Sequence, residues 1–190
     1  MSDGTLLVFS GPAGAGKDSV LIEYLKKNVP GVWKSVSYTT REPRDGEVDG
    51  VDYKFVSVDE FENLIEDNFF LEYARYGVNY YGTPKSYVDK HLENGDIVIL
   101  KIEVQGADQI KKLYPESIGA FIVPPSLEIL EKRLRERGTE TDEDILRRLD
   151  IAKDELAYSP NYDYHIINDR LQDAVDDLTA VIRALQLKNK

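Results

Sequence analysis

Short apolar runs alternate along the chain with stretches whose apolar residues recur at helical spacing. The apolar runs predict buried strands at residues 5–10, 36–40, 97–102, 118–123 and 164–167. The helical spacing and its capping residues predict helices over about 18–27, 84–94, 127–137, 145–156 and 171–187. Strands and helices that alternate in this way build a parallel sheet with helices on both faces. The pattern therefore predicts an α/β fold.

The stretch from 41 to 82 interrupts this alternation. It combines turn signals at 44–46 and 49–50 with Tyr and Phe runs and one short helix. Ser57 and Glu60 have the spacing of a capping box at the start of that helix. We therefore expect a small antiparallel β lobe inserted into the core. After the lobe, Thr83 and Pro84 open the next helix, with Thr83 as its cap.

The composition narrows the possible partners and cofactors. The 190 residues include 24 Lys and Arg against 35 Asp and Glu, a net charge of −11, and no Cys. A uniformly acidic chain repels phosphate backbones, so we expect no nucleic-acid partner. The lack of Cys excludes disulfides, iron–sulfur clusters and thiolate zinc sites. Neither a signal peptide nor an apolar span of about 18 residues is visible, which predicts a cytoplasmic protein with no membrane partner.

A glycine-rich loop with the spacing of a P-loop joins the first strand to the first helix. It consists of Gly11, Pro12, Ala13, Gly14, Ala15, Gly16 and Lys17. Glycines let backbone N–H groups face an anion, and the helix N-terminus adds a partial positive charge. Lys17 would bridge the outer phosphates of a nucleotide. A turn that only caps the helix is the alternative, but the strand–loop–helix context favours a nucleotide loop.

The residue after Lys17 departs from the usual P-loop pattern. A Ser or Thr that ligates magnesium is usual there, whereas this chain has Asp18, followed by Ser19. Asp18 could bind the metal directly or through water. It could equally repel the phosphates and weaken nucleotide binding.

Charged residues in the lobe suggest a second anion site and a base site. Arg41 and Arg44 flank Pro43, and two guanidinium groups at such a bend could clamp one phosphate dianion. In isolation, two solvated surface arginines are the simpler interpretation. Glu72 alternates with apolar neighbours on a predicted strand. The carboxylate lies either on the solvent-exposed face of the strand or in the interior. A buried carboxylate there would accept two N–H donors, such as those on the edge of guanine.

Together these segments resemble the guanylate kinase family along nearly the whole chain. The matching segments follow the family's order and spacing and are residues 10–17, 39–44, 46–53, 79–82, 104–106, 124–126, 137–139 and 168–169. Many proteins share the P-loop. The blocks Thr-Thr-Arg-Glu-Pro-Arg and Asn-Tyr-Tyr-Gly are specific to this family.

The resemblance implies a division of the chain and a role for each matched residue. Residues 37–82 would be the GMP-binding lobe, 138–146 a lid, and 1–36, 83–137 and 147–190 the P-loop core. Residues expected to bind GMP are Ser37, Arg41, Arg44, Tyr53, Glu72, Tyr81, Thr83 and Glu103. Residues expected to bind ATP are those from Gly11 to Ser19 together with Asn168, which would lie near the adenine. Residues expected to act on the transferring phosphates are Lys17, Arg41, Arg137 and Arg148.

Two further positions differ from the family pattern. Ala13 stands where Ser is usual, which should matter little because backbone N–H groups bind there. Lys101 replaces a usual acid at the end of a buried strand, while Glu103 keeps a carboxylate that could hold magnesium-bound water. The expected Mg²⁺ ligands are therefore Asp18 and Glu103.

The implied reaction transfers the γ-phosphoryl group of ATP to GMP, with dGMP as an additional acceptor, within guanine nucleotide metabolism. The acceptor oxygen is already ionised at neutral pH, so positioning and charge neutralisation suffice. The alternatives are a phosphopeptide-binding module without catalysis, a kinase for another phosphorylated acceptor, and an impaired homologue. The substrates GMP and ATP are the expected partners, and the chain would be a monomer or homodimer.

Overall fold

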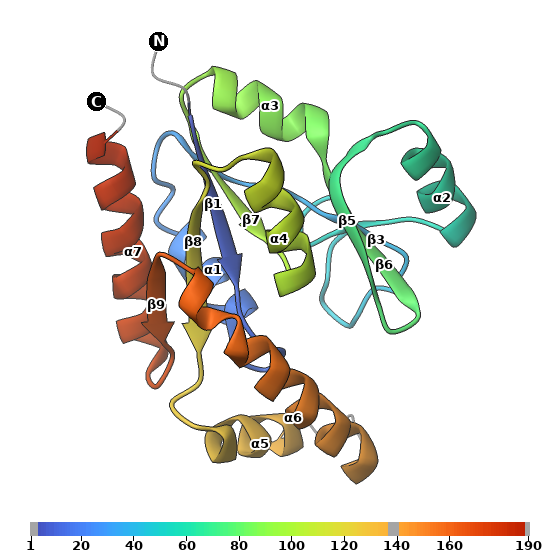
Figure 1. Cartoon of the computed structure of the whole chain (residues 1–190), viewed down its shortest axis with the longest axis vertical. Coiled ribbons are helices and arrows are strands. Elements are labelled where there is room, and N and C mark those ends of the chain that lie inside the picture. The colour runs from blue at the N-terminus through green and yellow to red at the C-terminus, as the bar shows by residue number, and fades with distance from the viewer. Residues whose placement is uncertain (1–3, 137–140, 189–190) are drawn as a thin grey trace.

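The computed structural model describes residues 4–136 and 141–188, and its core is a five-stranded sheet in which every strand pair is parallel. The strand order is β2-β7-β1-β8-β9 (Figure 1). The strands are β1 (Thr5–Ser10), β2 (Val32–Lys34), β7 (Ile97–Lys101), β8 (Ile118–Val123) and β9 (Tyr164–Ile167). Since parallel strands place their carboxyl ends at one edge, the loops after β1 and β7 emerge side by side.

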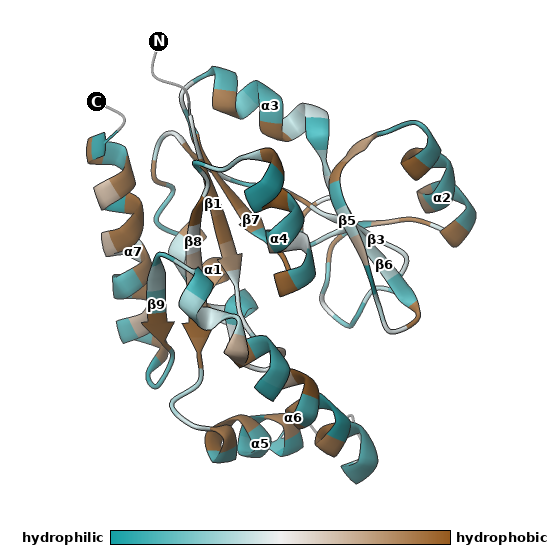
Figure 2. Ribbon diagram, viewed as in Figure 1, coloured by the Kyte–Doolittle hydropathy of each residue, from teal (hydrophilic) through white to brown (hydrophobic). Residues whose placement is uncertain are grey.

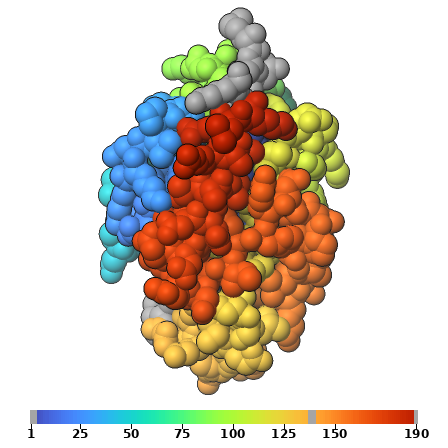
Figure 3. Space-filling model, turned by 90° about the vertical axis from the view of Figure 1, so that its left-hand side faces the viewer, coloured from blue at the N-terminus to red at the C-terminus, as the bar shows by residue number. Residues whose placement is uncertain are grey.

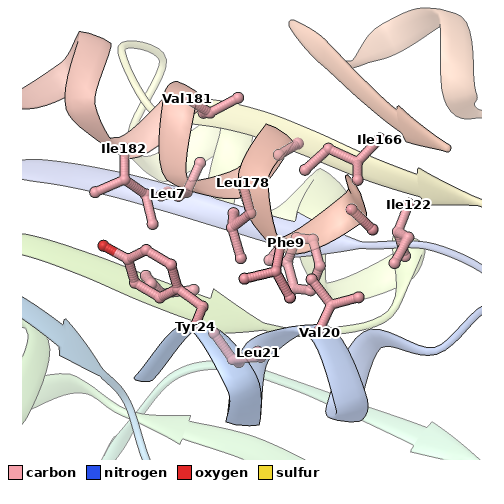
Figure 4. Close-up of a cluster of buried hydrophobic side chains, with 14 of the residues drawn as sticks. Leu7, Phe9, Val20, Leu21, Tyr24, Ile122, Ile166, Leu178, Val181 and Ile182 are labelled. Atoms are coloured by element: carbon pink, nitrogen blue, oxygen red, sulfur yellow. The ribbon is translucent and has the colours of Figure 1, made fainter. Parts of the chain in front are cut away.

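Helices α1 (Lys17–Leu25) and α7 (Leu171–Lys188) cover one face of this sheet. Figure 4 shows Leu7 and Phe9 of β1 packed between Val20, Leu21 and Tyr24 of α1 and Leu178 and Ile182 of α7. Figure 3 looks onto α7, with α6 (Asp142–Ala157) and α5 (Leu127–Glu136) below it. The sheet thus anchors α1, whose N-terminus carries the glycine-rich loop.

Helices α3 (Lys85–Glu93) and α4 (Val104–Leu113) cover the opposite face. Alternation along β1 sends Leu6 and Val8 to this side, where they pack with Val88 of α3 and Ile110 of α4. The central strands are accordingly apolar on both faces, as their brown colour in Figure 2 shows. Such strands are typical of buried parallel sheets. Within the described residues, no helix is long and apolar enough to cross a membrane.

The lobe stands beside the core as a second, four-stranded sheet with helix α2 (Val58–Glu66) packed on it (Figure 1). Its order is β4-β3-β6-β5, formed by β3 (Tyr38–Thr39), β4 (Lys54–Phe55), β5 (Phe70–Tyr76) and β6 (Asn79–Pro84). The sheet is mixed rather than antiparallel, because β3 and β4 run parallel while the other pairs are antiparallel. The predicted capping box is present, since Ser57 Oγ accepts from the Glu60 N–H at 3.1 Å.

Helices α5 and α6 form a separate hairpin with its own apolar cluster around Leu130, Leu134 and Leu149. Ser126 caps α5, with its hydroxyl oxygen accepting from the Ile129 N–H at 3.3 Å. A short 3₁₀ helix, η1 (Ser159–Asn161), connects α6 to β9. The hairpin places one face of α6 opposite the glycine-rich loop.

Several element predictions are wrong in detail. The strand predicted at 36–40 is only β3, and it belongs to the lobe sheet, while the core edge strand β2 and helix α4 were missed. The N-cap of α3 is Pro84 and not Thr83. Thr83 belongs to β6, and its hydroxyl donates to Glu72 instead of to the helix.

Candidate active site

A cavity of about 730 Å³ opens at the carboxyl edge of the core sheet, between the glycine-rich loop, the lobe and α6. The core lines it with Pro12, Ala13, Gly14, Gly16, Lys17, Asp18, Lys101 and Glu103. The lobe lines it with Ser37, Arg41, Arg44, Tyr53, Glu72 and Tyr81. Helix α6 contributes Arg147 and Arg148. Predicted residues from distant parts of the chain therefore meet in one cleft.

The glycine-rich loop is shaped so that α1 begins without a side-chain cap. Gly16 is the N-cap in a left-handed conformation, with φ of 94°. A Cβ on Gly16 would lie 2.2 Å from Asn168 Nδ2, so only glycine fits. The first N–H groups of a helix lack intrahelical partners. The loop therefore presents N–H donors and the positive helix end to an anion.

Asn168 holds this loop from behind and does not line the cavity. Its side chain is buried, and Nδ2 donates to the Ala15 carbonyl at 2.7 Å. Arg133 Nη2 in turn donates to the Asn168 carbonyl at 2.7 Å, which ties α5 to the same point. Asn168 is thus placed to shape the phosphate loop.

Lys17 is a buried cation at the floor of the cleft. Its Nζ donates to the Gly11 carbonyl and lies 3.2 Å from Glu103 Oε2. Glu103 is the N-cap of α4, directly after β7. The pair joins the loops after β1 and β7, and it places the ammonium where the outer phosphates of a nucleotide on the loop would lie.

Arg41 of the lobe is held in a fixed orientation. Its Nη2 donates to Glu47 Oε1 at 2.8 Å and its Nη1 to the Glu42 carbonyl at 2.6 Å. The guanidinium lies 5.5 Å from the centre of the Tyr53 ring. Glu47 was not predicted, and its second oxygen accepts from the Arg44 N–H at 2.7 Å. The carboxylate orders the two-arginine bend that the sequence suggested.

Glu72 is buried, so of the two positions considered from the sequence, solvent-exposed or interior, the structure shows the interior one. Its side chain accepts from the Thr83 hydroxyl at 2.6 Å, and the residue is 4% exposed. Burial raises the pKa of Glu72 to about 7 despite this hydrogen bond. A Cβ on Gly106 would lie 2.5 Å from Glu72 Oε2, so the glycine in α4 leaves room for the carboxylate.

Asp18 and Lys101, two of the three residues that depart from the family pattern, form an ion pair with each other. The Lys101 side chain is 10% exposed and that of Asp18 is 66% exposed. The Lys101 ammonium also lies 4.6 Å from the centre of the Tyr53 ring. Burial opposes its charge, but the Tyr53 hydroxyl and Asp18 outweigh burial and hold the pKa of Lys101 above its ordinary value.

Helix α6 brings a second buried carboxylate, Glu155, to the cleft region. The residue is 5% exposed, its Oε2 has no hydrogen-bond partner, and it interacts with the Ala13 N–H. Burial, followed by the nearby Glu103, raises the pKa of Glu155 to about 7. Glu155 lies seven residues after Arg148, two helical turns on, and that spacing was the available sequence signal.

Some predicted residues lie away from the cavity or outside the described residues. Those that do not line it are Gly11, Ala15, Ser19, Thr83 and Asn168. Gly11 and Ala15 are buried in the loop, Ser19 is exposed on α1, and the buried Thr83 donates its hydroxyl to Glu72. Arg137 and residues 138–140 of the predicted lid are outside the described residues, and α6 begins within the rest of that segment.

The carboxylates that line the cavity are the candidate ligands for a metal ion. Among residues 4–136 and 141–188, no group of three or more His, Asp or Glu could hold a metal ion. Four carboxylates line the cavity, namely Asp18, Glu47, Glu72 and Glu103. Glu47 and Glu72 are engaged within the lobe, which leaves Asp18 and Glu103 near the phosphate loop. Magnesium is usually held by one or two carboxylates plus substrate phosphates, so this donor set fits it.

The family model for guanylate kinase matches residues 3–185 of the chain. A guanylate kinase of Carboxydothermus hydrogenoformans is 50% identical over 190 residues, covering 100% of this chain and 93% of that protein. One of Gloeobacter violaceus is 52% identical over 171 residues, covering 90% and 83% of the two chains. The crystal structure of guanylate kinase from Anaplasma phagocytophilum matches with a TM-score of 0.81 and 32% identity, over 96% of this chain and 86% of that one.

Proposed function

We propose roles for the residues of the cleft in this chain, which belongs to the guanylate kinase family and transfers the γ-phosphoryl group of ATP to GMP. The fold class expected from the sequence is confirmed by the solved relative. The relatives are named as kinases, and they lend no support to the alternative of an impaired binding module.

Glu72 would read the guanine base. A carboxylate has two acceptor oxygens and complements the two adjacent N–H donors on one edge of guanine, whereas it repels the carbonyl edge of a competing base. Thr83 fixes the orientation of Glu72 through the 2.6 Å hydrogen bond, and Gly106 leaves the space beside it open. This buried, oriented carboxylate is the single observation that carries the choice of GMP as acceptor.

The GMP phosphate would lie against the lobe's cationic and hydroxyl groups. Arg41 and Arg44 face the cavity, and Ser37, Tyr53 and Tyr81 add hydroxyls around them. Two guanidinium groups can neutralise one dianion through charge-assisted hydrogen bonds. An oxygen of this phosphate is the nucleophile, and it is already ionised at neutral pH, so no general base is required.

ATP would bind with its phosphates on the N–H groups of the glycine-rich loop. Lys17 contacts the outer phosphates, and Arg148 of α6 faces the same cavity from the lid side. We assign Arg137 to the same task from the family resemblance. These cations stabilise charge on the transferred group, while closure of the lobe and lid excludes water and prevents idle hydrolysis.

Asp18 and Glu103 would hold Mg²⁺ near the phosphate loop, and the ion would supply neutralisation of phosphate charge. Both carboxylates are paired with lysines, so the protein's own contribution is to orient them at the carboxyl edge of the sheet. Glu103, the N-cap of α4, is the less exposed of the two, with its side chain 36% exposed against 66% for Asp18.

The division into core, GMP-binding lobe (37–82) and lid (138–146) belongs to the same proposal. So do a cytoplasmic location, a monomeric or homodimeric state and the use of dGMP as an alternative acceptor. Each rests on the sequence and on the family resemblance.

The direct test is ADP production from ATP and Mg²⁺ with GMP, AMP, CMP, UMP and dTMP in separate reactions. We expect turnover with GMP and at most traces with the others, because only guanine offers two adjacent N–H donors to Glu72. Equal turnover with AMP would show that the carboxylate does not select the base.

A further inference from the structure

Lys101 connects the two halves of the active-site cleft. It ends β7 in the core, and its ammonium pairs with Asp18, which directly follows Lys17 at the start of α1. The same ammonium lies 4.6 Å from the centre of the Tyr53 ring in the lobe. Lys101 also lines the cavity. The ammonium therefore stands at the boundary between the phosphate loop and the lobe, where donor and acceptor phosphates must meet.

The environment of Lys101 is unusual for a purely structural lysine. Its side chain is 10% exposed, whereas its carboxylate partner is 66% exposed. Removing an ammonium from water is costly, so a buried ammonium depends on the anionic and polar groups around it. An ammonium has three N–H donors, of which the Asp18 carboxylate and the Tyr53 hydroxyl account for two. The Lys101 ammonium therefore has a remaining N–H donor at the cavity wall, where an anion of higher charge than the Asp18 carboxylate could bind.

We propose that Lys101 contacts substrate, with its ammonium binding the phosphate dianion of GMP and Asp18 serving as the counter-ion that this dianion supplements or replaces. Tyr53 holds the ammonium toward the lobe from one side. The inference rests on the proposed function, since it takes GMP to be the acceptor. It assigns Asp18 a second task besides the proposed one at the metal.

A competing explanation is that Lys101 only neutralises Asp18, whose charge would otherwise repel the phosphates. The two explanations differ once Asp18 is removed. A lysine that acts only on Asp18 has no effect on phosphate binding in the Asp18→Ser background. A lysine that contacts the phosphate retains its effect there.

The experiment measures equilibrium binding of GMP and of guanosine to the wild type, Lys101→Met, Asp18→Ser and the double variant. We expect Lys101→Met to weaken GMP binding about 10- to 100-fold in both backgrounds, the range for losing a charge-assisted hydrogen bond. Guanosine binding should change less than about threefold, because it has no phosphate. Lys26→Met, which removes an exposed lysine paired with Glu23 on α1, is the matched control and should bind both ligands normally.

Two results would overturn the inference. One is that Lys101→Met has no effect on GMP binding in the Asp18→Ser background. The other is an equal loss for GMP and guanosine, which would indicate a structural role. A crystal structure of the unmodified protein with GMP provides a check free of folding effects: Lys101 Nζ should lie about 2.7–3.2 Å from a phosphate oxygen, and a longer separation contradicts the assignment. Turnover of GMP by the wild type tests the premise separately.

Discussion

The base site and the phosphate site of the cleft treat charge in opposite ways. Glu72 is a buried carboxylate that accepts a hydrogen bond from the neutral hydroxyl of Thr83. In the phosphate site, Lys17 is paired with Glu103, Arg41 with Glu47 and Lys101 with Asp18. The base site thus holds a buried carboxylate whose hydrogen-bond donor is neutral, whereas each of these three cations of the phosphate site forms an ion pair with a carboxylate.

The difference suits the ligands that we propose for the two sites. A guanine edge is neutral, so its N–H donors can add to a desolvated carboxylate without displacing another charge. A phosphate is a dianion, and cations clustered to bind it would repel one another without nearby acids. We therefore expect base-site variants to alter selectivity and phosphate-site variants to alter rate.

The largest effect should come from Lys17→Met. Removal of a preorganised charge from the transferred group typically lowers kcat about 10²–10³-fold or more. Steady-state ADP formation at saturating ATP and GMP measures the change. Lys153→Met, which removes an exposed lysine of α6 paired with Asp150, is the control and should keep wild-type kcat. A Lys17→Met enzyme within threefold of wild type would contradict the phosphate-site assignment.

Glu72→Gln should lower kcat/KM for GMP about 10²–10³-fold, because the amide presents a donor where guanine also presents one. The loss should be far smaller for AMP, so the variant loses discrimination between the two. Glu62→Gln, an exposed substitution in the same lobe, is the matched control. If discrimination survived in Glu72→Gln, selection of guanine would have to lie elsewhere.

Gly106→Ala should have a smaller effect on the same site. The added Cβ would lie 2.5 Å from Glu72 Oε2, so the carboxylate must shift. We expect KM for GMP to rise about tenfold, in line with about 1–3 kcal/mol for overpacking. In a Glu72→Gln background the same alanine should cost much less, and full additivity of the two changes would argue against this contact.

Glu155→Gln should give the smallest effect, on stability rather than on selectivity. The pKa of Glu155 rises from 4.5 to about 7 on folding, so the folded state takes up a proton. The associated stability is present below about pH 4.5 and is lost as the pH rises through about 7. Above that pH the variant avoids an ionised buried carboxylate, which is worth about 1–3 kcal/mol.

Thermal melting at pH 5 and pH 8 measures this effect. We expect the Tm of Glu155→Gln to exceed that of the wild type by a few degrees at pH 8. The gain should nearly vanish at pH 5. An equal gain at both pH values would mean that the ionisation of Glu155 is not its cause.

The sequence predicted those elements and site residues that are defined by a few residues close together in the chain. The phosphate loop, the buried strands β1 and β8 and the cap of α2 all follow from residues close together in the chain. The edge strand β2 was missed because its three residues are mixed in polarity and none is buried. Helix α4 was missed although its buried residues Val104, Ala107 and Ile110 recur at helical spacing, and Gly106 lies within that pattern.

The electrostatic pairing in the cleft could not be predicted from sequence. Asp18 and Lys101 are 83 residues apart, and Lys17 and Glu103 are 86 apart. No periodicity links such residues, and only the parallel pairing of β1 with β7 brings the following loops together. Glu72 was identified as a candidate, but its burial and its contact with Thr83 depend on the register of β5 with β6.

We expect Glu72, whose pKa burial raises to about 7, to accept the guanine edge as a carboxylate and to lose its proton when the base binds. Calorimetry of guanosine binding at pH 7, in buffers of different ionisation enthalpy, measures the protons released on binding. Because the pKa of Glu72 is about 7, the wild type should release about half a proton and Glu72→Gln none. No release from the wild type, or the same release from both proteins, would contradict the claim.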